Sequence, residues 1–210
     1  MDTLVALSSA TRWQHTPILS SGFALLDEHL PSGGWPLGVL IELLMDDWGC
    51  GELSLLLPAL RQVAAGWSHW INPPLKPYAP ALAAAALPLE RVLTIDAPAL
   101  KDQLWAMEQA IGSPAATSVL AWCGAVEERW LRRLQLAAHR TSCLCVVWRP
   151  QRFQTQRSPA ALRVVLDSTP CGLSVRTLKA RALIKKDTVL LPWETLWAHS
   201  AAWSPRANAG

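Results

Sequence analysis

The residues with the clearest chemical potential form a glycine-bearing loop after the apolar run 39–44. A loop between a strand and a helix binds phosphate when it reads G-x-x-x-x-G-K-[ST], because the Lys neutralises phosphate charge and the hydroxyl coordinates magnesium. Here Gly49 and Gly51 supply glycines, but Glu52 replaces the Lys and Leu53 replaces the hydroxyl residue. A carboxylate at this point repels phosphate. The loop therefore predicts a degenerate phosphate site that binds no nucleotide.

Other chemistry is sparse in the sequence. Asp46 and Asp47 add negative charge to the same loop. The cysteines are odd in number and form no C-x-x-C pair, which argues against a disulfide framework and a zinc site. Cys143 and Cys145 lie two apart in an apolar run, so we expect both in a buried core. We expect no catalytic residue, metal or cofactor, and hence a protein that is not an enzyme.

Charge is divided unevenly along the chain. Residues 1–128 hold 5 Lys and Arg against 13 Asp and Glu, whereas residues 129–210 hold 14 against 3. A basic C-terminal part favours an acidic partner, either DNA or a protein surface. The alternative is that these side chains are solvated outer-face positions. The candidate contact residues are Arg149, Arg152, Arg157, Lys179, Arg181, Lys185 and Lys186.

Tryptophan is unusually frequent, with 12 Trp against 1 Tyr and 2 Phe. Exposed Trp side chains are typical of protein-binding surfaces. Trp193 and Trp197, near the C-terminus, are therefore the candidate protein dock. A tail that folds back on its own core is the alternative explanation for these two residues.

Apolar periodicity predicts strands that alternate with helices, which is typical of a mostly parallel sheet flanked by helices. The predicted strands are 39–44, 67–71, 92–95, 118–122 and 143–148, and the predicted helices are 52–65, 81–86, 99–111 and 126–139. Two alternating runs, 162–166 and 173–178, predict an antiparallel hairpin at the sheet edge.

The 210 residues suit one α/β domain with extensions. We expect a flexible N-terminal arm (1–16), a core domain (17–182) and a Trp-bearing C-terminal tail (183–210). No apolar run approaches the roughly 20 residues of a membrane span, and the N-terminus lacks signal-peptide features, so we expect a cytoplasmic protein.

Several segments resemble the RecA core. They include Ser21-Gly22, the run Gly33-Gly34-Trp35-Pro36 and the Ile41-Glu42 strand that leads into the degenerate loop. Over residues 17–182 the chain more closely resembles the ImuA family, whose members are RecA-like and SulA-related. The most specific parts of that resemblance are Ser32-Gly33-Gly34-Trp35-Pro36, Gly49-x-Gly51-Glu52-Leu53, the segment 77–82 and the segment 133–138. The resemblance implies a RecA-like three-layer α/β core with a C-terminal hairpin.

The departures from an active RecA-like ATPase agree with one another. Besides Glu52 and Leu53, Trp122 stands near the position of the magnesium-associated Asp, and Asn72-Pro73-Pro74 replaces the carboxylate that would orient water. Tyr78 stands where an adenine would stack, and we expect it to be a packed loop aromatic. The resemblance thus implies a pseudo-ATPase.

By resemblance, the chain would be a non-catalytic accessory protein of SOS-induced translesion DNA synthesis. It would bind an ImuB-like Y-family polymerase subunit, with RecA, an error-prone replicative-type polymerase and non-specific DNA as further candidate partners. The alternative is a SulA-type inhibitor of cell division that binds FtsZ and blocks its polymerisation. Because the two functions share one degenerate core, the fold does not separate them.

Overall fold

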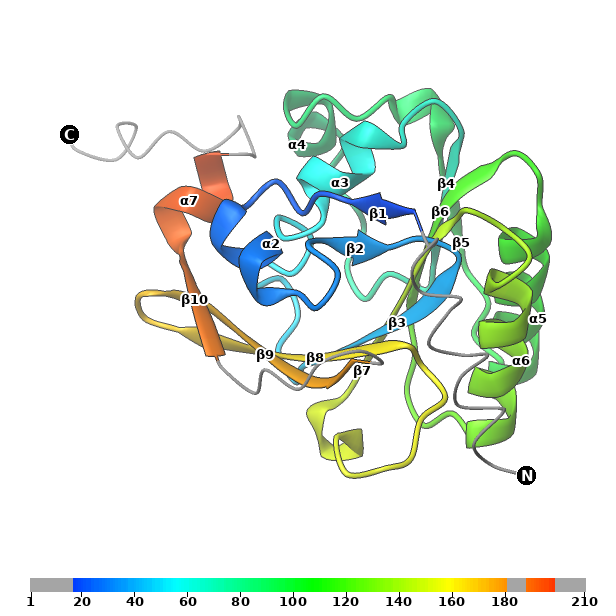
Figure 1. The fold of residues 1–210 in the computed structure, drawn as a ribbon. Coiled ribbons are helices and arrows are strands. Elements are labelled where there is room, and N and C mark those ends of the chain that lie inside the picture. Colours follow the sequence, from blue (N-terminus) through cyan, green and yellow to red (C-terminus); the bar gives the residue numbers. More distant parts are fainter. Residues whose placement is uncertain (1–16, 181–187, 199–210) are drawn as a thin grey trace.

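The computed structural model of the chain describes residues 17–180 and 188–198. These residues form a mixed α/β fold around an eight-stranded sheet of order β10-β9-β8-β3-β7-β6-β4-β5, with a separate two-stranded sheet β1-β2 (Figure 1). The strands are β1 (Ile18–Leu19), β2 (Trp35–Pro36), β3 (Val39–Leu44), β4 (Trp67–Ile71), β5 (Val92–Ile95), β6 (Ala116–Trp122), β7 (Leu144–Arg149), β8 (Leu162–Thr169), β9 (Gly172–Ala180) and β10 (Thr188–Pro192). The helices are α2 (Ala24–His29), α3 (Leu57–Gln62), α4 (Ala79–Ala84), η1 (Leu89–Arg91), α5 (Leu100–Gly112), α6 (Glu128–Ala138), η2 (Gln151–Phe153) and α7 (Trp193–Ala198).

The predicted parallel sheet is confirmed. Strands β8, β3, β7, β6, β4 and β5 run parallel to their neighbours, and β8 and β9 form the predicted antiparallel hairpin. Strand β10, which falls with helix α7 in the expected C-terminal tail, extends this sheet because it pairs antiparallel with β9. The expected N-terminal arm lies outside the described residues.

The helix predicted over 52–65 is shorter than expected. Helix α3 covers only Leu57–Gln62, with hydrogen-bonded turns on both sides. The carboxylate of Glu52 accepts a hydrogen bond from the Gly49 amide at 3.0 Å and so belongs to the preceding loop. Pro58, which has no amide hydrogen, is tolerated in the first turn of a helix, where that hydrogen is not needed.

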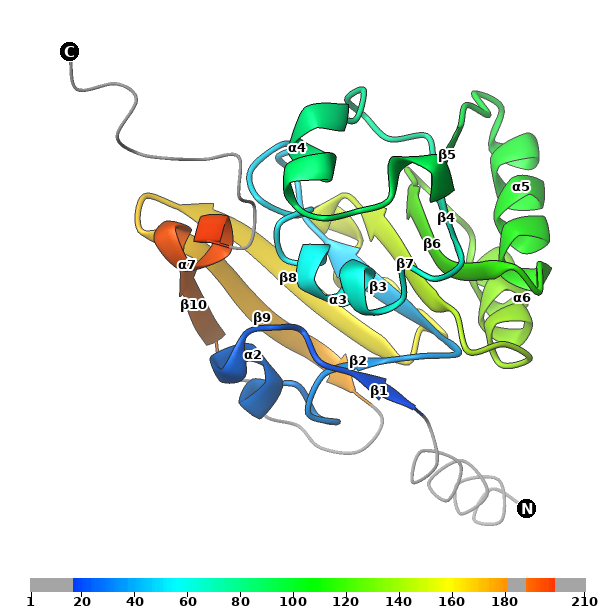
Figure 2. The same ribbon diagram turned by 90° about the horizontal axis from the view of Figure 1, so that it is seen from above.

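Helices cover both faces of the sheet. Helices α5 and α6 pack side by side on one face, while α2, α3 and α4 lie on the other (Figure 2). Each face has its own hydrophobic core, and strands β3, β6 and β7 contribute to both because alternate residues point to opposite faces. Cys143 and Cys145 are buried together in the α5–α6 core, as predicted.

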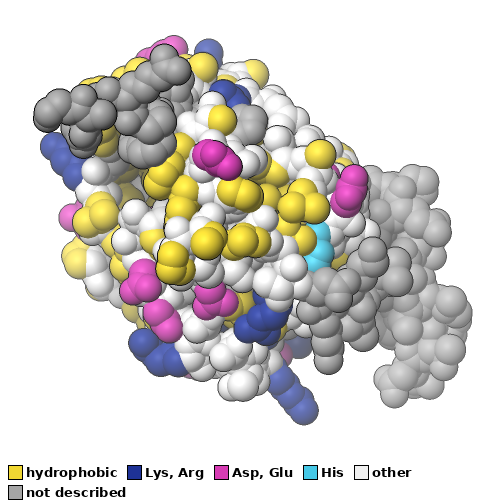
Figure 3. All heavy atoms as spheres, turned by 90° about the vertical axis from the view of Figure 1, so that its left-hand side faces the viewer, with side chains coloured by type: hydrophobic (Ala, Val, Ile, Leu, Met, Phe, Trp, Pro, Cys, Tyr) yellow, Lys and Arg dark blue, Asp and Glu magenta, His cyan; other side chains and the backbone are white. Residues whose placement is uncertain are grey.

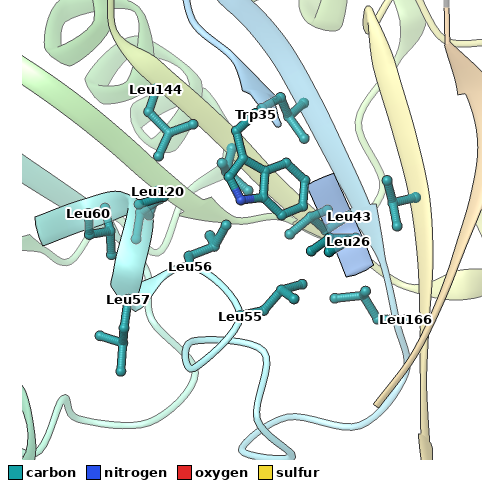
Figure 4. Close-up of a cluster of buried hydrophobic side chains, with 14 of the residues drawn as sticks. Leu26, Trp35, Leu43, Leu55, Leu56, Leu57, Leu60, Leu120, Leu144 and Leu166 are labelled. Atoms are coloured by element: carbon teal, nitrogen blue, oxygen red, sulfur yellow. The ribbon is translucent and has the colours of Figure 1, made fainter. Parts of the chain in front are cut away.

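Leucines and one tryptophan dominate the core on the α2–α3 side. The Trp35 indole is fully buried and lies among leucines of the sheet and of the turn that leads into α3 (Figure 4). Leu55, Leu56 and Leu43 are likewise fully buried. This packing holds the turn that leads into α3 against the sheet that contains β3. The glycine loop, which connects β3 to this turn, is therefore anchored at both ends.

Three further tryptophans line the same face near the carboxyl ends of the strands. Trp148 of β7 stacks on Trp122 of β6, its partner in register, with ring centroids 4.4 Å apart and planes 9° apart. Trp70 of β4 contacts Trp122 at 6.2 Å in a tilted arrangement. We call these three residues the tryptophan ladder. No described helix is long and apolar enough to cross a membrane.

Candidate protein-docking surface

The glycine loop (residues 45–52) is filled by the protein's own groups. Glu52 is 4% exposed, with one carboxylate oxygen on the Gly49 amide and the other without a partner among the described residues. The Gly49 amide, which could otherwise bind an anionic ligand, is therefore already hydrogen-bonded to the Glu52 carboxylate. Burial is the main cause that raises the pKa of the Cys50 thiol to about 11, and the Glu52 and Asp47 carboxylates raise it further.

The indole of Trp193 lies against Gly51 from the other side. Gly51 has φ +96°, and a Cβ atom there would lie 2.8 Å from the Trp193 ring. Trp193 itself stacks on Trp197, with centroids 5.4 Å apart, and its Nε1 donates to the Thr169 carbonyl at 3.0 Å. Both indoles are half-buried and pack within the fold, as the folded-back alternative expects. A contact of the pair with another protein stays a prediction.

Gly51→Ala should therefore destabilise the protein, because the new methyl group meets the Trp193 ring at a backbone conformation that L-residues avoid. We expect a loss of about 1–3 kcal/mol in the free energy of unfolding, measured by urea denaturation. Gly124→Ala is the control, since a Cβ atom there has no neighbour within 4 Å. Equal stability of the two variants would contradict this packing role.

Hydrophobic side chains do gather on the face that carries α7 and β10 (Figure 3). Exposed apolar residues of the elements there include Leu25 of α2, which is 53% exposed, and Leu190 of β10, which is 42% exposed. Strand β10 is one edge of the sheet.

The basic candidates do not form one surface. Arg149 is fully buried and donates to Glu42 Oε1 at 2.5 Å, to the Val126 carbonyl and to Gln156, so its expected contact with DNA or an acidic partner is wrong. Arg152 is exposed and lies over the Phe153 ring at 4.9 Å. Arg157 and Lys179 are exposed and line a pocket beside α6. Arg181, Lys185 and Lys186 lie outside the described residues.

Arg149 belongs to a buried ionic triad. Glu42 of β3 receives Arg149 on one oxygen and Arg163 of β8 on the other, both at 2.5 Å. Glu42 and Arg149 are fully buried and the Arg163 side chain is 7% exposed. Arg149 also bonds Val126 of the β6–α6 connection, and Arg163 bonds the carbonyls of Phe153 and Gln154. The triad therefore fixes two loops to the sheet.

An exposed apolar surface lies at the opposite edge of the sheet, next to the terminal strand β5. Three exposed apolar side chains come from the segments on either side of α4, namely Leu75, Tyr78 and Leu89, which are 62%, 70% and 38% exposed, and we call this set the Tyr78 surface. Leu89 lines the groove described below, and Leu75 also lies beside Gly49 of the glycine loop. The expectation that Tyr78 is a packed loop aromatic is wrong. Leu93, on β5 itself, is 43% exposed, and the outer edge of β5 pairs with no strand in the described part of the chain.

A groove of about 610 Å³ adjoins these side chains between α4 and β5. Its walls are mostly apolar and include Pro73, Pro77, Ala79, Leu82, Leu89 and Val92, with Lys76 and Asp96 as charged members. A few large exposed apolar groups around a concave surface are typical of protein-binding sites. The sequence showed the aromatic and the prolines, but their exposure depends on how α4 packs.

The groove has a rigid base. Asn72, at the end of β4, adopts φ +51° and clamps the chain after β5, because its side-chain amide donates to the Ala97 carbonyl at 2.8 Å and accepts from the Ala97 amide at 2.7 Å. Four prolines between residues 73 and 80 restrict the backbone that follows. A surface held in this way loses little conformational entropy when a partner binds.

Comparison with known proteins gives a consistent result. The family model described as "Cell division inhibitor SulA" matches residues 38–145, which is just over half of the chain. Three curated proteins with that description are similar to the chain, from Photorhabdus laumondii (32% identical over 111 residues, 52% of this chain and 63% of the relative), Serratia proteamaculans (27% over 144, 68% and 83%) and Edwardsiella piscicida (32% over 102, 47% and 61%). The matched part thus spans less than two thirds of the first and third relatives.

Proposed function

Because the chain belongs to the SulA family of cell division inhibitors, we propose that it inhibits cell division during the SOS response by binding FtsZ and blocking its polymerisation. This was the alternative that the degenerate core left open. The observation that carries the proposal is the position of the Tyr78 surface, which lies entirely within residues 38–145, the part that matches the family model.

The family match corrects the closer resemblance drawn from the sequence. The identification with ImuA is wrong, and with it the role in translesion DNA synthesis and the ImuB-like polymerase subunit as partner. The motifs that suggested ImuA are those of the core that the two families share, so they could not distinguish them.

The other candidate contact surfaces fit this function less well. Arg152, Arg157 and Lys179, like the Trp193–Trp197 pair, lie beyond residue 145 and outside the matched segment. The Tyr78 surface also has what an FtsZ-binding surface needs, namely exposed apolar side chains, a groove and a rigid base. The outer edge of β5, which pairs with no other strand among the described residues, offers backbone groups to a partner.

We also propose that inhibition involves no catalysis and that the core is a RecA-like pseudo-ATPase. The hydrogen bond from Gly49 to Glu52 and the apolar Leu53 support the absence of phosphate binding in the glycine loop. The order of the parallel strands, with β3 between β7 and β8, supports a RecA-like core.

Tyr78→Ala should weaken inhibition of FtsZ while leaving the fold intact, because Tyr78 is 70% exposed and contributes little to the core. Loss of a central aromatic from an interface costs about 2 kcal/mol or more, so we expect the concentration for half-maximal inhibition to rise about 30-fold. The measurement is light scattering of purified FtsZ assembling with GTP, at increasing concentrations of the full chain.

Trp105→Ala is the matched control. Trp105 of α5 is 64% exposed, lies within the matched segment and does not line the groove. It should inhibit like the unaltered protein. If the unaltered chain does not slow FtsZ assembly, the proposed function is wrong; if Tyr78→Ala and Trp105→Ala behave alike, the function stands but the surface is wrong.

A further inference from the structure

A second pocket, of about 560 Å³, lies far from the Tyr78 surface, where helix α6 meets the crossover loop 150–161 and the β8–β9 hairpin. Strands β3, β7, β6 and β4 separate this part of the sheet from β5. The pocket is lined by Glu128, Arg132, Gln135, Leu136, His139, Arg157, Ser158, Pro159, Arg163 and Lys179. Its volume is within the range of small-molecule sites, about 300–1,000 Å³.

Positive charge dominates the pocket wall. Arg132 comes from α6, Arg157 from the crossover loop, Arg163 from β8 and Lys179 from β9. Among the described residues that line the pocket, Glu128 is the single carboxylate, and it faces Arg132 at 3.5 Å. Four cations from four different segments therefore surround a space that holds one acidic group, which is a strong local attraction for an anion.

Arg163 differs from the other three cations of the pocket because it is nearly buried. Its side chain is 7% exposed, and its ionic partner Glu42 also binds Arg149, so the buried triad carries two guanidinium groups for one carboxylate. Of the five N–H groups of Arg163, three donate to Glu42, Phe153 and Gln154, which leaves two without a partner among the described residues. Arg163 is thus a nearly buried cation at the pocket wall whose charge is only partly balanced by the shared Glu42 carboxylate.

The cationic groups are also held in place. Lys179 lies directly opposite Arg163 in the β8–β9 register, and its ammonium donates to the Ser158 carbonyl at 2.6 Å. Arg163 bonds two carbonyls of the same crossover loop. The loop that carries Arg157 is therefore attached to both strands, and an anion would find the cations already positioned.

We propose that this pocket binds a small ligand that carries a chain of phosphate groups. A polyphosphate chain brings several negative charges and many acceptor oxygens into a small volume, which matches four converging cations better than a single carboxylate does. The exposed side chain of Leu136, which lines the same pocket as Pro159, can contact an apolar part of the ligand. The proposal is independent of FtsZ binding, since the two surfaces share no residue.

The test is isothermal titration calorimetry of the full chain with tripolyphosphate, with ATP in the presence of EDTA and with hexaglutamate. Arg132→Gln/Arg157→Gln removes two exposed pocket cations, one from α6 and one from the loop. Arg129→Gln/Arg152→Gln is the matched control, because it removes the same charge from α6 and from η2 outside the pocket. Arg129 also pairs with Glu127 as Arg132 does with Glu128. Thermal melting confirms that both variants fold.

We expect tripolyphosphate to bind, with affinity that falls as salt rises, and the pocket variant to bind about tenfold more weakly or worse. The control variant should bind within about twofold of the unaltered protein. ATP binding as tightly as tripolyphosphate assigns recognition to the phosphate chain, and tighter ATP binding assigns the site to a nucleotide. No binding, equal loss in both variants, or hexaglutamate binding as tightly as tripolyphosphate would overturn the proposal.

Discussion

Glu42→Ala is expected to lower the free energy of unfolding by about 3–5 kcal/mol, because it leaves Arg149 and Arg163 buried without their shared carboxylate. The two guanidinium groups remain charged in any folded state, so the structure must either keep an uncompensated charge inside or open to water. Opening would also release Val126 and the loop at Phe153–Gln154, which the arginines hold.

Urea denaturation measures this effect without adding salt that would screen the ion pairs. Glu108→Ala is the control, since Glu108 pairs with Arg133 across two helices at the surface, and we expect a loss below about 1 kcal/mol. Glu42→Gln keeps the shape of the side chain but not its charge. Its loss in the free energy of unfolding should lie between those of Glu42→Ala and Glu108→Ala. If Glu42→Ala is no more destabilising than Glu108→Ala, the triad does not stabilise the fold.

The sequence indicates the buried carboxylate of this triad but not its two arginine partners. A single carboxylate in the apolar run 39–44 signals a buried partner, but Arg149 and Arg163 are 107 and 121 residues away along the chain. Their adjacency depends on β3 lying between β7 and β8, an order that periodicity does not specify. Because this strand order is not visible in the sequence, Arg149 cannot be told apart there from the exposed arginines.

Local patterns predicted most strands and the hairpin, because a buried strand is recognisable from its own residues. They could not predict exposure, which depends on what packs against a segment. Tyr78 and Trp193 show this: Tyr78 is exposed although the sequence favours a packed loop aromatic, and Trp193, for which the sequence leaves both a protein dock and a folded-back tail open, covers Gly51. The candidate docking surface was therefore found only in three dimensions.

The tryptophan ladder carries the second large effect. Trp148 is fully buried, and its ring stacks on Trp122 at 4.4 Å. Its indole Nε1 has no hydrogen-bond partner among the described residues, so its contribution comes from packing. Trp148→Ala removes the ring and leaves a cavity, and we expect a loss of about 3–5 kcal/mol in the free energy of unfolding. Trp148→Phe keeps an aromatic ring and no polar partner is lost, so its loss should stay below about 2 kcal/mol.

The loss of stability in Trp148→Ala should not be accompanied by a loss of FtsZ inhibition. Below its lowered melting temperature, folded Trp148→Ala should still inhibit FtsZ assembly, because Trp148 is buried in the sheet and the Tyr78 surface does not include it. Tyr78→Ala should show the reverse, with normal stability and weak inhibition. Circular dichroism melts and FtsZ light scattering on the same samples check both. Loss of inhibition by a Trp148→Ala protein that is fully folded would contradict the assignment of inhibition to the exposed surface alone.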